Sequence, residues 1–318
     1  MAAHIRIGIS GWRYAPWRNV FYPKGLVQKR ELEFASRALP TIELNGSFYA
    51  LQRPSSYLHW YEQTPPGFIF SIKATRYITH VLRLRDVEQP MANFFASGLL
   101  LLKEKLGPIL WQFPPSFRFD ATLFEHFLKL LPHDTHAAAK LAEHRDASMY
   151  GREYIKAEEK RPLRHAVEIR NQSFETPEFI ALLRKYKVAL VIADTAGKWP
   201  DKKDITADFT YLRLHGAEAL YASGYTDKAL DDWALRIEAW SKGTQPKDAR
   251  LISDQAPLPR KSRDVYCYFD NDIKVKAPFD ARKLLRRLDM ESGLAELDWS
   301  HAEESGKLNP TKVRTNKS

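Results

Sequence analysis

Eight short runs of apolar and β-branched residues recur along the chain, and most neighbouring runs are separated by a segment of helical pattern. Runs of this composition and length predict strands. When strands alternate with helices, neighbouring strands pair in parallel through right-handed crossovers. We therefore predict eight strands, at His4–Ser10, Thr41–Phe48, Gly67–Ala74, Gly107–Phe113, His165–Asn171, Val188–Ala193, Phe209–His215 and Asp264–Asp272.

The helical segments complete a repeating strand–helix order. One of them begins with clear capping chemistry, because Thr176 can cap the first turn and Pro177 suits the first helical position. The order predicts an α/β fold, a single (β/α)8 TIM barrel over residues 1–296, and a barrel of this length is common as one domain. The predicted helices are Lys29–Leu39, Pro54–Gln63, Asp86–Glu104, Ala121–Leu131, Pro177–Lys187, Leu230–Ser241 and Asp280–Leu288.

Three segments depart from this order. His133–Arg164 is charged and helix-prone without a strand pattern, and it predicts a helical insertion after the fourth unit. Thr195–Asp208 carries Gly197 and Pro200 and predicts a loop. Residues 297–318 form a polar end, basic and almost free of apolar residues from about Glu303, which predicts a disordered tail.

Polar side chains occur at the ends of most of the predicted strands. Three strands end in pairs spaced two residues apart, Glu43 with Asn45, Glu168 with Arg170, and Arg213 with His215. A spacing of two places both members of a pair on one face of a strand. Since the site of a TIM barrel lies at the C-terminal ends of its strands, we expect these side chains to converge there.

This convergence defines the predicted site. Two opposed carboxylates, Glu43 and Glu168, can act as an acid and a base, because a carboxylate beside another has a raised pKa. His215 ends a strand beside Arg213 and is either an acid–base group or a hydrogen-bonded core histidine. The predicted catalytic residues are Glu43, Glu168, Asp194 and His215, and the predicted substrate-binding residues are Asn45, Tyr49, Lys73, Arg76, His80, Gln112, Arg170, Arg213, Asn271 and Asp272.

The charges favour an anionic ligand. The loop Thr75–Arg85 is the most basic stretch outside the tail, and arginine binds phosphate or carboxylate through paired hydrogen bonds. The formal net charge of +10 also permits nucleic-acid binding. The structural alternatives are an ion network that closes the barrel mouth and a solvated run of charges.

Metal binding is also conceivable from residue type, since Glu43, Glu168, Asp194 and His215 are all side chains that ligate metal ions. Lys73, Arg170 and Arg213 would repel a cation, and the chain has no HxH motif or cysteine cluster. We therefore predict no metal and no cofactor. A single cysteine, Cys267, and no apolar run near the roughly 18 residues of a membrane helix predict a cytoplasmic protein in a reducing setting.

Several ordered motifs also carry a family resemblance: IGISGWRYAPWRNVFYP, IELNGSFYALQRP, TRYITHVLRL, LWQFPPSF, AVEIRNQSF, TADFTYLRLHG and VYCYFDND. They resemble the motifs of the YecE-like family, domain of unknown function 72, from about Ile5 to Leu288. The resemblance implies a TIM-type barrel and no particular reaction. Members often carry His-x-Ser-Trp where this chain has Asn171–Phe174, and Tyr-Phe-Asn-Asn-Asp where it has Tyr268–Asp272.

Three functions are consistent with these observations. The first is an enzyme that uses metal-independent acid–base chemistry on a small anionic substrate. The second is a metal-dependent nuclease or hydrolase acting on nucleic acid, which the barrel suggests only by analogy. The third is a non-catalytic module that binds an anion in the same bowl, meaning the concave site formed by the polar side chains at the strand ends.

Overall fold

The eight apolar runs form the strands of one closed, parallel barrel in a computed structural model that describes residues 3–216, 224–271 and 275–300. Each strand pairs with the next along the chain, and β8 pairs with β1 to close the cylinder. The prediction of a TIM-type barrel is confirmed. The strands are β1 (Ile5–Ser10), β2 (Thr41–Leu44), β3 (Ile69–Lys73), β4 (Leu106–Gln112), β5 (His165–Glu168), β6 (Ala189–Asp194), β7 (Phe209–Leu214) and β8 (Asp264–Phe269).

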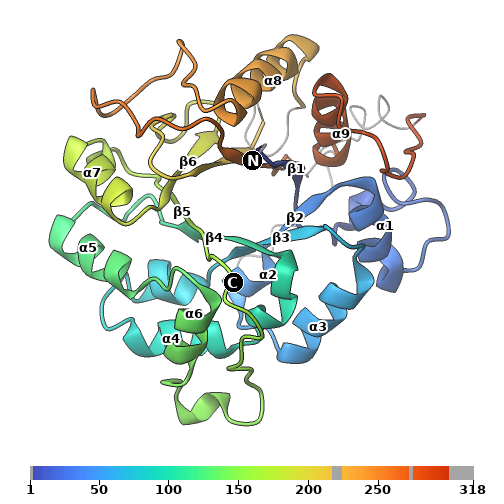
Figure 1. The fold of residues 1–318 in the computed structure, drawn as a ribbon. Helices are drawn as coiled ribbons and strands as arrows, with labels where there is room; N and C mark the ends of the chain where they lie inside the picture. The colour runs from blue at the N-terminus through green and yellow to red at the C-terminus, as the bar shows by residue number, and fades with distance from the viewer. Residues whose placement is uncertain (1–2, 217–223, 272–274, 301–318) are drawn as a thin grey trace.

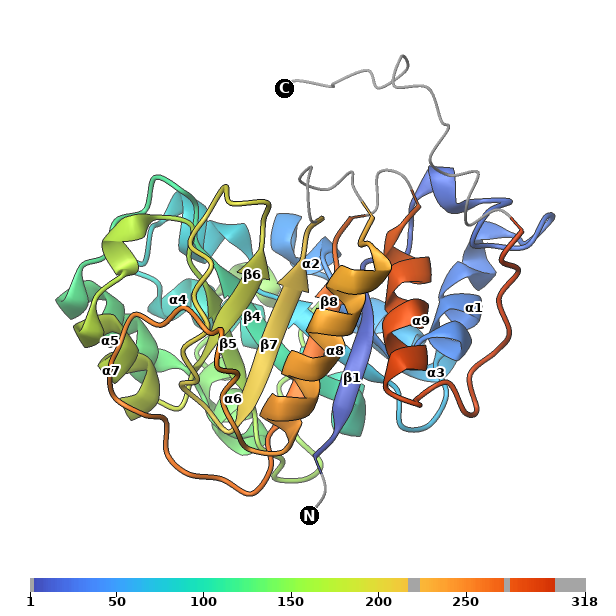
Figure 2. The ribbon, with the colours of Figure 1, turned by 90° about the horizontal axis from the view of Figure 1, so that it is seen from above.

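Most of the helices follow one another around the barrel in chain order (Figure 1). Thr176 caps α7 as predicted, because its hydroxyl accepts a hydrogen bond from the backbone N–H of Phe179. The helices are α1 (Glu31–Ala38), α2 (Gly46–Tyr49), α3 (Pro54–Gln63), α4 (Glu88–Ala96), α5 (Ala121–Leu130), α6 (Thr135–Ala142), α7 (Pro177–Lys185), α8 (Asp227–Ser241) and α9 (Ala277–Arg287). Seen from the side, β6 and β7 point toward the same end of the barrel, where their C-termini lie (Figure 2).

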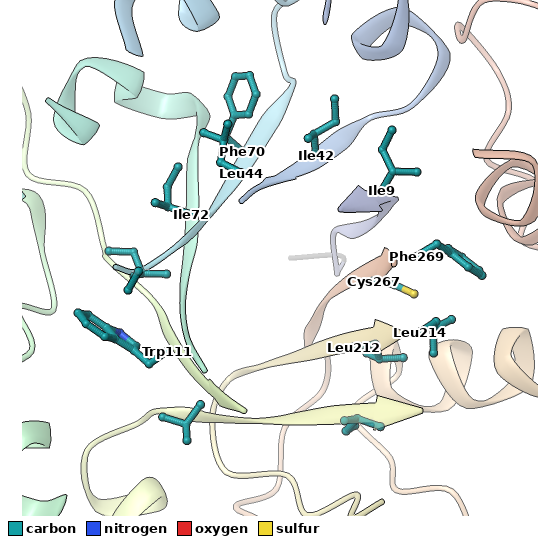
Figure 3. Packing of buried hydrophobic residues seen from close by; sticks show 14 of the residues in the cluster. Ile9, Ile42, Leu44, Phe70, Ile72, Trp111, Leu212, Leu214, Cys267 and Phe269 are labelled. Atoms are coloured by element: carbon teal, nitrogen blue, oxygen red, sulfur yellow. The ribbon is translucent and has the colours of Figure 1, made fainter. Parts of the chain in front are cut away.

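The two faces of each strand have different roles. Outward side chains such as Ile42, Leu44 and Trp111 are buried against the surrounding helices (Figure 3). Inward side chains include polar groups that meet across the barrel, since the Ser71 hydroxyl of β3 lies 2.8 Å from the Tyr211 hydroxyl of β7. Side chains alternate between the two faces of each strand, so every second residue points inward. Because all eight strands are parallel, the last inward residues of the strands lie at the same rim.

Several predicted elements end earlier than the sequence suggested, among them the second strand and the helix over Asp86–Glu104. The second strand stops at Leu44, and the chain turns at Asn45 into the short helix α2. The helix predicted over Asp86–Glu104 is broken at Gly98, whose φ of +113° lies in the left-handed region. The chain continues from there as a 3-10 segment, Leu99–Lys105.

Gly98 gives a first stability prediction. A Cβ at this position would lie 2.6 Å from the Cα of Pro54, and an L-residue is strained at this φ. We expect Gly98→Ala to lower the free energy of unfolding by about 1–3 kcal/mol, the usual cost of such strain. Urea unfolding measures this change. Gly67→Ala is the control for positive φ alone, since a Cβ there meets nothing within 4 Å, and an equal loss in both variants would contradict the packing argument.

The predicted insertion is only partly helical. It contains α6 and a single 3-10 turn at Ala147–Met149, and the rest of it has no regular element. The segment between β6 and β7 is a loop, as predicted. At the C-terminal side, Leu297 is 9% exposed and Trp299 packs on Phe279, so packing against the barrel continues beyond residue 296. Residues 301–318, most of the predicted tail, lie outside the described residues.

Candidate functional site

Arg213 forms the centre of a buried ion network at the C-terminal rim of the barrel. It is the fifth residue of β7, points inward, and is 1% exposed. Its guanidinium donates to Glu43 of β2 at 2.8 and 3.1 Å, to Glu168 of β5 at 2.7 Å and to Asp270 after β8 at 2.8 Å. The convergence predicted for strands two, five and seven is therefore present.

Glu43 is fully occupied by its neighbours. One carboxylate oxygen accepts from Arg213 and from the Ser10 hydroxyl, and the other accepts from Arg213 and from the Tyr211 hydroxyl at 2.6 Å. The side chain is 0% exposed. Asn45 joins this corner, since its amide donates to Ser10 Oγ at 3.0 Å. Glu43 thus anchors Arg213 and has no surface left for a substrate.

Glu168 is also held by cations. It accepts hydrogen bonds from Gln112 at 2.9 Å and Arg170 at 2.8 Å, in addition to Arg213. Burial alone would raise the pKa of Glu168, but the charges of Arg170 and Arg213 hold it well below its ordinary value. The predicted acid and base pair depended on two carboxylates beside each other, but Arg213 lies between Glu43 and Glu168 and the pKa of Glu168 is lowered.

Asp270 and His215 form the third corner of the network. Asp270 Oδ2 lies 3.0 Å from His215 Nδ1 and also accepts from Arg213. His215 is 0% exposed, and its ring packs edge-on against Trp199, over which Arg170 lies at 3.7 Å. Burial would raise the pKa of Asp270, but Arg213 and His215 lower it to about 2. Asp270 is 9% exposed and so reaches the surface of the bowl.

The low pKa of Asp270 predicts acid sensitivity. Its folded pKa of about 2 lies below the ordinary 3.8, so its stabilising effect is present above about pH 4 and is lost as pH falls toward 2. The shift corresponds to a free energy on the order of 2 kcal/mol. We expect the stability gap between the wild type and Asp270→Asn to close by that amount between pH 4 and pH 2. Urea unfolding at several pH values measures the gap, and parallel curves would contradict the assignment.

Lys73 is the remaining cation of the inner rim. It ends β3, is 8% exposed, and places its ammonium over the Phe48 ring at 4.2 Å. No carboxylate of the described residues lies within 4.0 Å of its Nζ, and none of those residues accepts a hydrogen bond from it. Burial, and then the charge of Arg213, lower the pKa of Lys73 to about 8.

The basic loop after β3 contributes two further predicted residues. His80 is half-buried, packs edge-on against Phe48 at 5.1 Å, and shares a hydrogen bond with Thr79 through Nδ1. Burial and the charge of Lys73 lower the pKa of His80 to about 4, so the imidazole is neutral at pH 7. Arg76 is exposed beside this loop.

Three more predicted residues contact other parts of the structure or lie exposed. Asp194 pairs in register with Leu214 on the outward side of the strands, and its carboxylate accepts from the Tyr225 hydroxyl at 3.0 Å. Asn271 donates to Asp280 of α9 at 2.9 Å. Tyr49 is 71% exposed at the end of α2. Asp194 ends β6 and Asn271 follows β8, and each lies one residue away from an inward position, so alternation turns both side chains outward. Asp272 lies outside the described residues.

The prediction omitted several residues of the network. Asp270, Ser10, Tyr211 and Trp199 all take part, yet none was among the predicted site residues. For Asp270 a signal was present, because Tyr266, Tyr268 and Asp270 alternate along one face of the last strand. Trp199 comes from a loop, where no periodic pattern could place it.

The chemistry of the described residues does not favour a metal ion. None of their His, Cys, Asp and Glu side chains form a group of three or more that could hold one. The guanidinium of Arg213 lies between the carboxylates, where a cation would have to bind. Among these same residues, no helix is long and apolar enough to cross a bilayer.

A cavity of about 830 Å³ lies at the opposite end of the barrel. It is lined by residues that precede β5, β6 and β7, among them Arg164, Lys187 and Asp208, together with Tyr266 of β8. None of the predicted site residues lines it. The ion network, in contrast, lies at the rim where TIM barrels carry their active sites.

The fold and the network together define a (β/α)8 barrel protein with a buried, charged site at its C-terminal rim. Residues 6–305 match the family model described as "Protein of unknown function DUF72", so the chain belongs to the DUF72 family. The resemblance found in the motifs is confirmed.

The relatives agree with this assignment. The chain is 24% identical over 321 residues to the UPF0759 protein YunF of Bacillus subtilis, covering 92% of this chain and 97% of that protein. It is 30% identical over 129 residues to the UPF0759 protein YecE of Escherichia coli K12, covering 40% of this chain and 44% of that one. A crystal structure of a DUF72 family protein from Thermotoga maritima has a TM-score of 0.68 at 23% identity, covering 90% of this chain and 99% of that one. This last similarity establishes the fold.

Proposed function

We propose that this protein is an enzyme that binds a small anionic substrate at the C-terminal rim of its barrel and acts by acid–base chemistry without a metal ion. The observation that carries the proposal is the amine of Lys73, a buried cation that none of the described carboxylates neutralises. A buried charge without a partner is costly, and an anionic ligand would supply the missing partner.

The distribution of charge supports this view. The three inner carboxylates all bind Arg213, and Glu168 also binds Arg170. The carboxylates are therefore committed to guanidinium groups, and the lysine amine is left to interact with a ligand. His80 on the shared Phe48 ring and the exposed Arg76 lie on the same loop, where further hydrogen bonds to a phosphate or carboxylate group can form.

Proton transfer to or from a substrate requires a side chain that is accessible from the bowl. Glu43, Glu168 and His215 are each at most 1% exposed, whereas Lys73 and Asp270 are 8% and 9% exposed. A general acid or base works best when its pKa lies near the working pH, and the pKa of Lys73 is about 8. We therefore assign proton transfer to Lys73, and we assign the three buried groups to holding Arg213 and Asp270 in place.

A ligand and turnover screen tests the proposal. Protein freed of metal with a chelator is combined with phosphate- and carboxylate-bearing metabolites, and the melting temperature and substrate loss are both followed. We expect at least one anionic compound to raise the melting temperature and to be converted. Binding without conversion would reduce the protein to an anion-binding module. Conversion only after a divalent metal is restored would overturn the metal-independent mechanism.

A further inference from the structure

Three lysines of the described residues are at least nine-tenths buried, and they differ in what their amines contact. Lys105 donates to two backbone carbonyl oxygens and a threonine hydroxyl at 2.7–3.1 Å. Lys203 lies 2.6 Å from an aspartate oxygen. Lys73 makes no such contact with the described residues and meets only the face of Phe48. Two buried amines thus have structural partners, and the one at the catalytic rim does not.

The surroundings of Lys73 hold the side chain in place without binding its nitrogen. The Ser47 hydroxyl donates to the Lys73 backbone oxygen at 2.6 Å and so fixes the end of β3. The charged groups that influence the amine are Arg213, Glu168, Glu43 and Asp270, and all three carboxylates turn their oxygens to Arg213. The nitrogen lone pair, once the amine loses its proton, is therefore available to a ligand.

We propose that Lys73 is a nucleophilic amine that condenses with the aldehyde or ketone group of an anionic substrate to form an imine, an inference that rests on the function proposed above. In this step the Nζ lone pair forms a bond to the carbonyl carbon, and the carbonyl oxygen takes up a proton. The resulting carbinolamine then loses its hydroxyl group as water while the C=N bond forms. One water leaves in all, and no oxidant or reductant is consumed.

Two properties of the site suit this chemistry. An amine with a pKa of about 8 is neutral in roughly a quarter of molecules at pH 7.5, against about one in a thousand for an ordinary lysine. The carbonyl oxygen and the departing hydroxyl group can take up protons from solvent, which reaches the site beside Lys73 and Asp270, since these residues are 8% and 9% exposed.

Reductive trapping of the wild-type protein tests the inference. The protein is incubated at pH 7.5 with glyoxylate, an aldehyde that carries a carboxylate, and sodium cyanoborohydride, and modified lysines are located by peptide mass spectrometry. Lys228, whose side chain is 86% exposed, serves as the internal reference. We expect Lys73 to be modified at least tenfold faster than Lys228 and Lys105, and we expect Lys73→Met to lose only this adduct. Modification of Lys73 no faster than Lys228 would overturn the inference.

A second aldehyde separates failure of the imine from failure of anion binding. Acetaldehyde is neutral, and its Lys73-to-Lys228 rate ratio is compared with the ratio for glyoxylate. A larger ratio for glyoxylate supports both the imine and the anionic substrate. Equal ratios above ten keep a nucleophilic Lys73 but contradict the proposed anion site. No Lys73 adduct in the wild type, together with anion binding that is lost in Lys73→Met and kept in Lys73→Arg, removes the imine and leaves the proposed function standing.

Discussion

Replacing Arg213 with methionine is expected to lower the free energy of unfolding by about 3–5 kcal/mol, the usual cost of removing one partner from a buried ion network. Methionine fills much of the same volume, so a packing loss is not the main cause. The variant leaves the carboxylates of Glu43, Glu168 and Asp270 buried without the guanidinium that now contacts each of them.

Urea unfolding at pH 7 measures this loss, with Arg236→Met as the control. Arg236 pairs with Asp248 on the surface, where the two side chains are 23% and 55% exposed. Exposed pairs of this kind contribute about 1 kcal/mol or less. A loss for Arg213→Met no larger than that of the control would show that the inner carboxylates do not depend on Arg213.

Replacing Lys73 with methionine is expected to have the opposite effect and to stabilise the protein. The folded pKa of about 8 lies below the ordinary 10.5, so below pH 8 the charged amine opposes folding. Between pH 8 and 10.5 the Lys73 amine is neutral in the folded state and still charged in the unfolded state. The destabilising effect of the charge therefore disappears over this pH range. We therefore expect Lys73→Met to be more stable than the wild type by up to about 3 kcal/mol at pH 7. The difference should shrink toward zero by pH 10.5.

The matched control is Lys105→Met. Lys105 is 5% exposed against 8% for Lys73, but its amine donates to three oxygen atoms, which would lose this donor. Its loss is expected to destabilise the protein by about 1–3 kcal/mol at pH 7. Unfolding curves of both variants between pH 6 and 10.5 provide the comparison. A destabilising Lys73→Met with an unchanged pH dependence would mean that the Lys73 amine has a structural partner.

The position of the inner site was predictable from the sequence because two rules act together. Strand side chains alternate, and the C-terminal ends of barrel strands meet at one rim. These rules bring Glu43, Lys73, Glu168 and Arg213 together without knowledge of any loop. The eight strands were predictable because their outward residues are apolar. These residues pack in one hydrophobic core with the apolar side chains of the helices.

The remaining features depended on details that alternation alone does not fix. Asp194 was assigned inward because it ends a strand, but the pairing of Asp194 with Leu214 puts it on the outward face. The acid–base roles of Glu43 and Glu168 required knowing which charge lies between them, and no spacing in the sequence specifies a contact between strands two, five and seven. The sequence also does not show that Lys73 lacks a carboxylate partner among the described residues. That conclusion requires the positions of Glu43, Glu168 and Asp270, which all pair with Arg213.

Both the proposed function and the imine depend on a buried Lys73 amine that no described carboxylate pairs with, and the ionisation of that amine can be measured directly. Protein labelled with ¹³C at lysine Cε is titrated by NMR, and the Lys73 resonance is identified by its absence in Lys73→Met. We predict a Lys73 resonance with a midpoint near pH 8. A Lys73 resonance that titrates near the ordinary pKa of 10.5 would show a charged and well-partnered amine and would contradict both proposals.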